Sequence, residues 1–137
     1  MSEKVLVIDD DADLALLSTI WARAAGYDVI MARDGLSGLA AAKSHRPDII
    51  LLDIMMPGLD GFEVSRRLKA DPDLAPIPVI FLSAKVQETA RRQAAAAGGK
   101  YFLSKPYECA DLIAAIKLAV MSNTSPLVRF PMECRGA

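Results

Sequence analysis

The chain has 137 residues with 16 basic and 17 acidic side chains, a net charge of −1, and 53% of its residues are hydrophobic. This length favours one domain, and the near-neutral charge argues against a broad basic surface, so we expect no direct binding to nucleic acid. The apolar stretches are shorter than the ~20 residues of a membrane span and the N-terminus lacks the apolar core of a signal peptide, so we expect no membrane insertion and a cytoplasmic protein.

Strands and helices are predicted to alternate along the chain. Short apolar runs bounded by turn residues indicate strands at residues 4–8, 28–32, 49–52, 79–82 and 101–103. Each run precedes a stretch of helical periodicity, and we expect helices at residues 12–25, 36–45, 62–70, 88–97 and 108–121. Because a strand that is followed by a crossover helix returns in parallel, this alternation predicts a parallel sheet with right-handed connections.

The strands are apolar throughout, so helices must cover both faces of the sheet. The sequence therefore predicts an α/β domain with a doubly wound (βα)5 flavodoxin-like fold, in which a five-stranded parallel sheet has the strand order 2-1-3-4-5. We assign this domain to residues 1–122. Residues 123–137 are expected to be a C-terminal tail that is too short to form an output domain.

The periodicity of the first two helices predicts which side chains face the core. The expected inward residues are Leu14, Leu17, Trp21 and Ala24 in the first helix, and Leu36, Leu39 and Ala40 in the second. Asp10 or Asp11 should cap the first helix by accepting a free backbone N–H. Gly26 should end that helix in a left-handed conformation.

Polar side chains follow four of the predicted strands. Asp9 and Asp10 follow the first, Asp53 the third, Ser83 the fourth, and Lys105 comes just after the fifth. In the predicted order these four strands are successive neighbours about 4.8 Å apart. Ligands of open α/β sheets bind at the carboxyl ends of the strands. We therefore expect these five side chains to meet in one shallow pocket.

The chemistry of this pocket follows from its charges. Three carboxylates that lie close together repel one another, and a divalent cation removes that conflict. A ligand set made only of oxygen atoms favours Mg²⁺, and the absence of histidine and cysteine among these residues argues against zinc. Asp53 could act as a nucleophile and form an acyl phosphate. Lys105 and Ser83 would then neutralise charge on the transferring phosphoryl group.

Four segments together resemble the receiver domain of two-component response regulators. In chain order they read Val-Leu-Val-Ile-Asp-Asp (5–10), Leu-Leu-Asp-Ile-Met-Met-Pro-Gly-Leu-Asp-Gly (51–61), Leu-Ser-Ala (82–84) and Phe-Leu-Ser-Lys-Pro (102–106). Each segment alone is a weak signal, whereas all four in family order and with fitting intervals are a strong one. The resemblance extends over residues 4–121.

The resemblance implies a phosphorelay protein and a role for each polar residue. Asp53 would accept a phosphoryl group from a histidine kinase or a histidine phosphotransfer protein. Asp9 and Asp10 would hold Mg²⁺ (or Mn²⁺) together with Asp53 and the backbone carbonyl of Met55, and Lys105 would contact the phosphoryl group. The protein would promote only its own phosphorylation and dephosphorylation, so we do not expect an enzyme that acts on other substrates.

The resemblance also implies how the signal leaves the pocket. Ser83 would swing inward to hydrogen-bond the phosphoryl group, and Phe102 could fill the space left beside Ala84. The family often has tyrosine at the position of Phe102, which here cannot form a phenolic hydrogen bond. The surface formed by the helix at 88–97, the following strand and the last helix would change and bind an unknown downstream protein, with a phosphorylation-dependent homodimer left open. The peptide bond between Lys105 and Pro106 is expected to be cis.

Two other functions share parts of this pattern. A phosphatase of the haloacid dehalogenase type also uses an aspartyl nucleophile with a metal, but it needs a second aspartate two residues later, where this chain has Met55. A flavodoxin-like flavin carrier has the same architecture, but it needs a Ser/Thr/Gly-rich phosphate loop after the first strand, where this chain has aspartates. The phosphatase is kept as the alternative to the phosphoacceptor.

Overall fold

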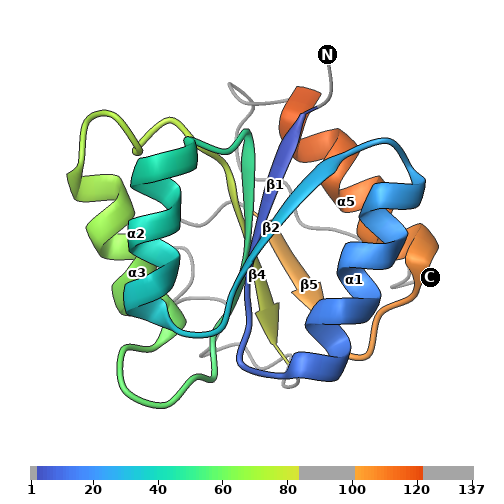
Figure 1. Cartoon of the computed structure of the whole chain (residues 1–137), viewed down its shortest axis with the longest axis horizontal. Coiled ribbons are helices and arrows are strands. Elements are labelled where there is room, and N and C mark those ends of the chain that lie inside the picture. The colour runs from blue at the N-terminus through green and yellow to red at the C-terminus, as the bar shows by residue number, and fades with distance from the viewer. Residues whose placement is uncertain (1–2, 84–100, 122–137) are drawn as a thin grey trace.

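The computed structural model describes residues 3–83 and 101–121, and its elements are arranged as one layered domain (Figure 1). The strands are β1 (Lys4–Ile8), β2 (Asp28–Ala32), β3 (Ile49–Asp53), β4 (Val79–Ser83) and β5 (Tyr101–Ser104). The helices among the described residues are α1 (Ala12–Ala24), α2 (Gly35–His45), α3 (Gly61–Ala70) and α5 (Cys109–Met121). The predicted helix at 88–97 and the predicted tail lie outside the described residues.

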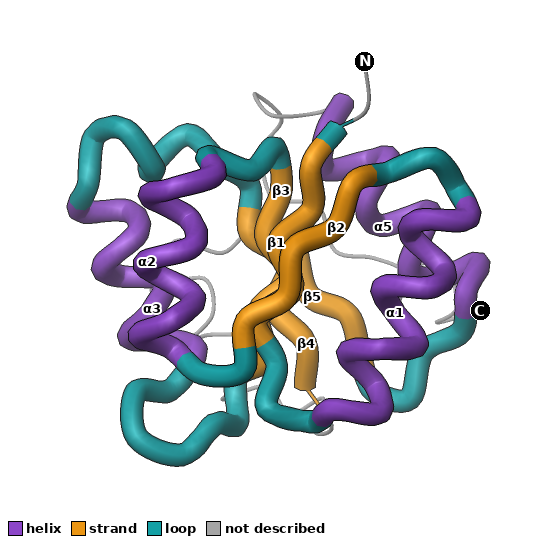
Figure 2. The backbone as a smooth tube through the Cα atoms, in the orientation of Figure 1, coloured by secondary structure: helices purple, strands orange, loops and turns teal. Residues whose placement is uncertain are grey.

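The five strands form one parallel sheet in the order β2-β1-β3-β4-β5, which confirms the predicted fold class and strand order. Helices α2 and α3 cover one face of the sheet, and α1 and α5 cover the other (Figures 1 and 2). Every residue of β3 and of β4 is buried, which is why these strands are apolar until their last residues. Within the described residues, no helix combines the length and hydrophobicity that a membrane span requires.

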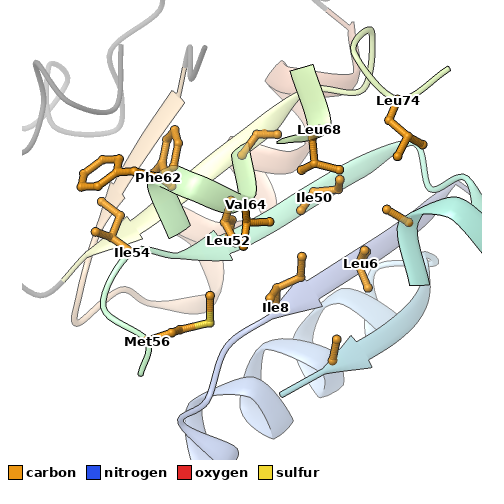
Figure 3. Packing of buried hydrophobic residues seen from close by; sticks show 14 of the residues in the cluster. Leu6, Ile8, Ile50, Leu52, Ile54, Met56, Phe62, Val64, Leu68 and Leu74 are labelled. Carbon is orange, nitrogen blue, oxygen red and sulfur yellow. The ribbon is translucent and has the colours of Figure 1, made fainter. Parts of the chain in front are cut away.

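Alternate residues of each strand pack into two separate cores, one on each face of the sheet. Beneath α2 and α3, Leu6, Ile8, Ile50 and Leu52 of the strands meet side chains from α3 such as Leu68 (Figure 3). The core beneath α1 and α5 is built from the intervening strand residues and from the inner faces of these helices, and it includes Val5, Val7, Ile49, Leu51, Leu82, Leu112 and Ile116.

The ends of α1 agree with the prediction from the sequence, but its buried face agrees only in part. Asp11 caps the helix by accepting the backbone N–H of Leu14 at 3.2 Å, and Gly26 has a φ of +99°, as predicted. The predicted inward stripe is right for Leu14 and Trp21, which are half-buried and pack against the core, but wrong for Leu17, which is 41% exposed, and for Ala24, which is also exposed. The buried residues are instead smaller, namely Ala15, Ser18, Thr19 and Ala22.

On α2, as on α1, the buried residues are smaller than the predicted ones. Leu36 is 65% exposed and Ala40 is exposed, and only Leu39 packs partly against the core. The buried positions are Gly35, Gly38 and Ala42. A Cβ atom on Gly38 would lie 2.6 Å from Cδ1 of Ile8. Helix α2 therefore approaches the sheet so closely that small residues, not leucines, must face it.

Candidate functional site

Two buried carboxyl groups lie side by side at the carboxyl edge of the sheet. Ile8 of β1 is in register with Leu52 of β3, so the next residues, Asp9 and Asp53, reach this edge at the same level. The alternation of side chains places both on the face covered by α1 and α5. Asp9 is 0% exposed and Asp53 is 3% exposed. The parallel register of two buried strands thus explains why two acids are buried together.

Asp10 completes a group of three carboxylates. Asp9, Asp10 and Asp53 each offer a ligand atom, and these atoms all lie within 4.8 Å of one another. Oδ1 of Asp9 accepts the backbone N–H of Asp11 at 3.0 Å. Oδ2 of Asp9 is buried and forms no hydrogen bond with the described residues, although it forms an ion pair with the Lys105 ammonium at 3.3 Å. A buried carboxylate oxygen without a hydrogen bond, within an all-oxygen donor set, fits a hard divalent cation such as Mg²⁺.

Lys105 bridges the two buried acids. Its Nζ atom lies 3.3 Å from Oδ2 of Asp9 and 3.2 Å from Oδ1 of Asp53. The backbone N–H of Lys105 donates to the carbonyl oxygen of Ser83 at 2.7 Å, so the end of β4 fixes the height at which Lys105 leaves β5. The Lys105–Pro106 peptide bond is cis, as expected. Among the residues that the structure describes, the pocket thus holds one ammonium group against three carboxylates.

Burial and the surplus of negative charge together change the acidity of Asp53. Burial, and then the negative charge of Asp9, raise the pKa of Asp53 to about 7, although the ammonium of Lys105 acts in the opposite direction. A carboxyl group with this pKa is partly protonated at neutral pH when no cation is bound. A divalent cation among the three acids would favour the carboxylate, which is the form that can act as a nucleophile.

The two residues predicted to relay the signal lie on the other face of the sheet. Ser83 follows Leu82, the register partner of Asp53, and it is 3% exposed. Phe102 pairs in register with Phe81, and its buried ring belongs to the core beneath α2 and α3. Ser83 therefore ends β4, the strand next to the one that ends at Asp53, whereas Phe102 lies one strand further away, on β5. Ala84 lies outside the described residues.

The loop that follows Asp53 contains a residue whose role the sequence did not reveal. A Cβ atom on Gly61, at the start of α3, would collide with the carbonyl oxygen of Asp53 and would lie 2.8 Å from Cα of Ile54. The backbone N–H of Gly61 donates to the carbonyl oxygen of Ile54 at 3.0 Å. Asp60 caps α3 by accepting the N–H of Glu63 at 2.9 Å. Gly61 therefore allows α3 to begin directly against the Asp53 backbone.

Met55 lies in this same loop, and its side chain is 68% exposed. Its predicted role concerns only the backbone carbonyl, so the exposed thioether does not conflict with it. Two residues on the other side of the pocket, Ser18 and Tyr107, were also not predicted, although their hydroxyl groups are buried together at a separation of 2.7 Å. No spacing pattern in the sequence could have paired two residues so far apart in the chain.

Comparison with known proteins agrees with this geometry. A family model described as the response regulator receiver domain matches residues 5–117. The DNA-binding response regulator MtrA of Mycobacterium tuberculosis is 35% identical over 123 residues, which are 90% of this chain and 53% of that protein. The chain therefore spans about half the length of this curated relative.

Solved structures show the same fold. The chemotaxis protein CheY4 of Vibrio cholerae has a TM-score of 0.83 and 27% identity, and the match covers 85% of this chain and 98% of that one. The receiver domain of the sensor histidine kinase PA1611 from Pseudomonas aeruginosa has a TM-score of 0.83 and 27% identity, with coverages of 89% and 100%. That structure has a magnesium ion coordinated in its active-site cleft.

Proposed function

This chain belongs to the response regulator receiver domain family of two-component systems, and from that premise we propose that Asp53 is its phosphoacceptor. The observation that carries the proposal is the position of Asp53, which lies 3.2 Å from the ammonium of Lys105 and within the three-carboxylate group. The phosphoryl donor is a phosphohistidine of a histidine kinase or of a histidine phosphotransfer protein. A carboxylate oxygen of Asp53 bonds to phosphorus as the P–N bond breaks, and the released imidazole takes up a proton.

Asp9, Asp10 and Asp53, with the backbone carbonyl of Met55, are the residues that would hold Mg²⁺ or Mn²⁺. The ion supplies positive charge that offsets the three carboxylates and the phosphoryl oxygens. The buried Oδ2 of Asp9, which lacks a hydrogen bond among the described residues, supports this assignment. So does the absence of sulfur and nitrogen donors from the cluster.

Lys105 has two tasks in this proposal. Before transfer, its ammonium lies between Asp9 and Asp53 and favours the ionised form of Asp53. After transfer, the same ammonium lies within reach of a phosphoryl oxygen and neutralises part of its charge. Because both tasks need the ammonium at the mouth of one pocket, removal of Lys105 should slow the reaction more than it weakens metal binding.

Ser83 and Phe102 would convert phosphorylation into a change at the surface. The Ser83 hydroxyl would donate to a phosphoryl oxygen, and Phe102 would shift its position in the core that it shares with Phe81. The change would then reach β5 and α5 and alter the face presented to a downstream protein or to a second phosphorylated copy. This is a shift between two populated states, and its size is limited by how differently the two states bind the phosphoryl group.

The proposal assigns phosphoacceptance to residues 1–122 and no reaction on other substrates. The near-neutral charge of the chain supports the further proposal that this domain makes no direct contact with nucleic acid. The name of MtrA states that this longer protein binds DNA. We do not propose DNA binding for this chain.

Intact-mass measurement tests the proposed function directly. Incubation with phosphoramidate or acetyl phosphate and Mg²⁺ should add about 80 Da, the mass of one phosphoryl group. The adduct should be absent in Asp53→Asn and present in the matched control Asp60→Asn, since Asp60 only caps α3. An adduct of equal yield in Asp53→Asn would disprove the assignment. Repeated turnover of a small phosphate ester would favour the phosphatase instead.

A further inference from the structure

The chain segment that follows Lys105 has a single buried anchor. Between Leu103 and Leu112, only the side chain of Tyr107 is buried, and Pro106 is exposed. Proline also lacks the backbone N–H with which it could bind to a neighbour. Tyr107 is therefore the buried side chain that anchors this segment between β5 and the core residues of α5.

Tyr107 is held by its ring and by its hydroxyl group. The ring packs in the core beneath α1 and α5 and forms a T-shaped contact with Trp21 at a centroid distance of 6.4 Å. The hydroxyl lies 2.7 Å from Oγ of Ser18, and Ser18 is fully buried. A phenylalanine ring would fill the same volume without the need for a polar partner. The hydroxyl pair thus adds a directional link that packing alone does not supply.

This link joins the two sides of the phosphoacceptor pocket. Ser18 belongs to α1, the helix that begins directly after the acidic residues of the β1–α1 loop. Tyr107 comes two residues after Lys105. Burial, together with the negative charges of Asp9 and Asp53, raises the pKa of Tyr107 to about 12. The hydroxyl therefore keeps its proton and can donate a hydrogen bond at every pH at which phosphorylation would be measured. The hydrogen bond therefore ties the helix behind the acids to the segment that carries the ammonium.

We propose that the hydrogen bond between Ser18 and Tyr107 positions Lys105, and that both are positioning residues for phosphoryl transfer. The inference rests on the proposed function and assigns it a further structural requirement. The side chain of lysine is a flexible four-carbon stem, so its ammonium stays between two acids only if its backbone is fixed on both sides. On the N-terminal side, the hydrogen bond from the Lys105 N–H to the carbonyl oxygen of Ser83 fixes the backbone. On the C-terminal side, the buried and hydrogen-bonded Tyr107 fixes it.

The test uses three variants and one control in the full chain. Tyr107→Phe, Ser18→Ala and the double variant remove the link. Thr19→Val is the matched control, because the Thr19 hydroxyl is buried on the same helix but donates only to the carbonyl oxygen of Ala15 at 2.8 Å. Two quantities are measured: the rate constant of phosphorylation by phosphoramidate at saturating Mg²⁺, and the NMR signal of the Lys105 ammonium, assigned by its loss in Lys105→Met.

Loss of the link should lower the rate constant by about threefold or more, because the ammonium is less well oriented. The Mg²⁺ concentration for half-saturation should stay within about twofold, since the metal-holding acids lie on other segments. The Lys105 ammonium signal should shift or broaden. The double variant should unfold at nearly the wild-type denaturant concentration, because both partners are then apolar, and yet it should remain slow. If the link only stabilised the fold, the double variant would recover the wild-type rate together with the wild-type stability.

Wild-type values of both the rate and the ammonium signal in the double variant would overturn the proposal. So would an equal loss of rate in Thr19→Val, or a slow variant whose Lys105 signal is unchanged. If Tyr107→Phe does not fold, Ser18→Ala and the control decide. The ammonium signal needs no phosphoryl donor, so a wild-type protein that accepts no phosphate would disprove the proposed function while the positioning of Lys105 could still be judged.

Discussion

The two faces of the sheet bury different kinds of side chain at the same edge. On the α1–α5 face lie the acids Asp9 and Asp53 with the Lys105 ammonium, and behind them the hydroxyl groups of Ser18 and Tyr107 are hydrogen-bonded. On the α2–α3 face, Ser83 closes a core that is otherwise formed by apolar side chains such as Phe81 and Phe102. Because side chains alternate along each strand, Asp53 at the end of β3 and Ser83 at the end of the neighbouring β4 lie on opposite faces, which separates the proposed reaction from its proposed readout.

This difference has an energetic consequence. On the α1–α5 face, called the polar face below, the buried carboxylates of Asp9 and Asp53 repel each other and destabilise the metal-free protein. On the α2–α3 face, called the apolar face below, stability depends on close contact between backbone and side chains. Changes on the polar face should therefore affect function strongly and stability in a pH-dependent way. Changes on the apolar face should affect stability at every pH. The predictions below test this contrast, from the largest expected effect to the smallest.

The largest effect is expected from Asp53→Asn without divalent cations. The pKa of Asp53 is raised to about 7 in the folded state and is about 3.9 in an unfolded chain, so the folded state binds more protons between these values. The free energy of unfolding should therefore fall as the pH rises from about 4 to about 7. Asp53→Asn should remove this loss and stabilise the protein at pH 8 by about 2–4 kcal/mol.

Urea unfolding in EDTA across this pH range measures the effect. Asp28→Asn is the matched control, since Asp28 is an exposed acid at the start of the edge strand β2, and it should keep the wild-type pH dependence. The same stability slope in Asp53→Asn as in the wild type would show that the conflict between the buried acids does not control the stability of the polar face.

Gly61→Ala should have the next largest effect. The added Cβ would collide with the backbone of Asp53 and Ile54 rather than with a movable side chain, so the loop or α3 must shift. We expect a loss of about 2–4 kcal/mol at all pH values, with slower phosphorylation. Gly58→Ala is the control: it has a φ of +76° but open space around its Cβ, and it should lose only about 1 kcal/mol. Equal losses in chemical denaturation would contradict the steric account.

Ser83→Ala should separate the reaction from its readout. Asp53 should still accept a phosphoryl group, because its nucleophilic oxygen and the Lys105 ammonium are unchanged. The shift of the NMR signals of β5 and α5 on phosphorylation should fall to less than about half, since one hydrogen bond to a charged group contributes ~1.5–3 kcal/mol. The control is Ser104→Ala, which changes the register partner of Ser83 on β5 and should leave the shift at its wild-type size. A full wild-type shift in Ser83→Ala would show that the hydroxyl does not couple the two faces.

The sequence predicted the elements that carry the site better than the surfaces that pack around it. Strand ends and turn residues are local features, so the positions of Asp9, Asp53 and Lys105 follow from strand order and register alone. The link between Ser18 and Tyr107 joins residues 89 positions apart, and such a contact leaves no periodic signal. The role of Gly61 was likewise hidden, because a glycine in a loop indicates a turn and does not reveal a close approach of two backbones.

The helix faces were predicted only in part because hydrophobicity and burial differ on α1 and α2. Apolar residues surround much of α1, so the predicted stripe combined Leu14 and Trp21, which pack against the core, with residues that are exposed. On α2 the close contact with the sheet selects glycine and alanine, which give no hydrophobic signal. The large residues are then left on the outside. Burial on these helices is therefore determined by the distance to the sheet, which only the fold defines.

Leu36→Ser gives the smallest expected effect and tests this explanation. Because Leu36 is 65% exposed, its replacement should change the free energy of unfolding by less than about 0.5 kcal/mol. Gly38→Ala, on the buried side of the same helix, should destabilise the protein by about 1–3 kcal/mol, since its Cβ would press on Ile8, even though alanine is the better helix former. Urea unfolding of the two variants compares them directly. If Leu36→Ser were the more destabilising change, the leucines of α2 would face the sheet, and the explanation by close packing of small residues would be wrong.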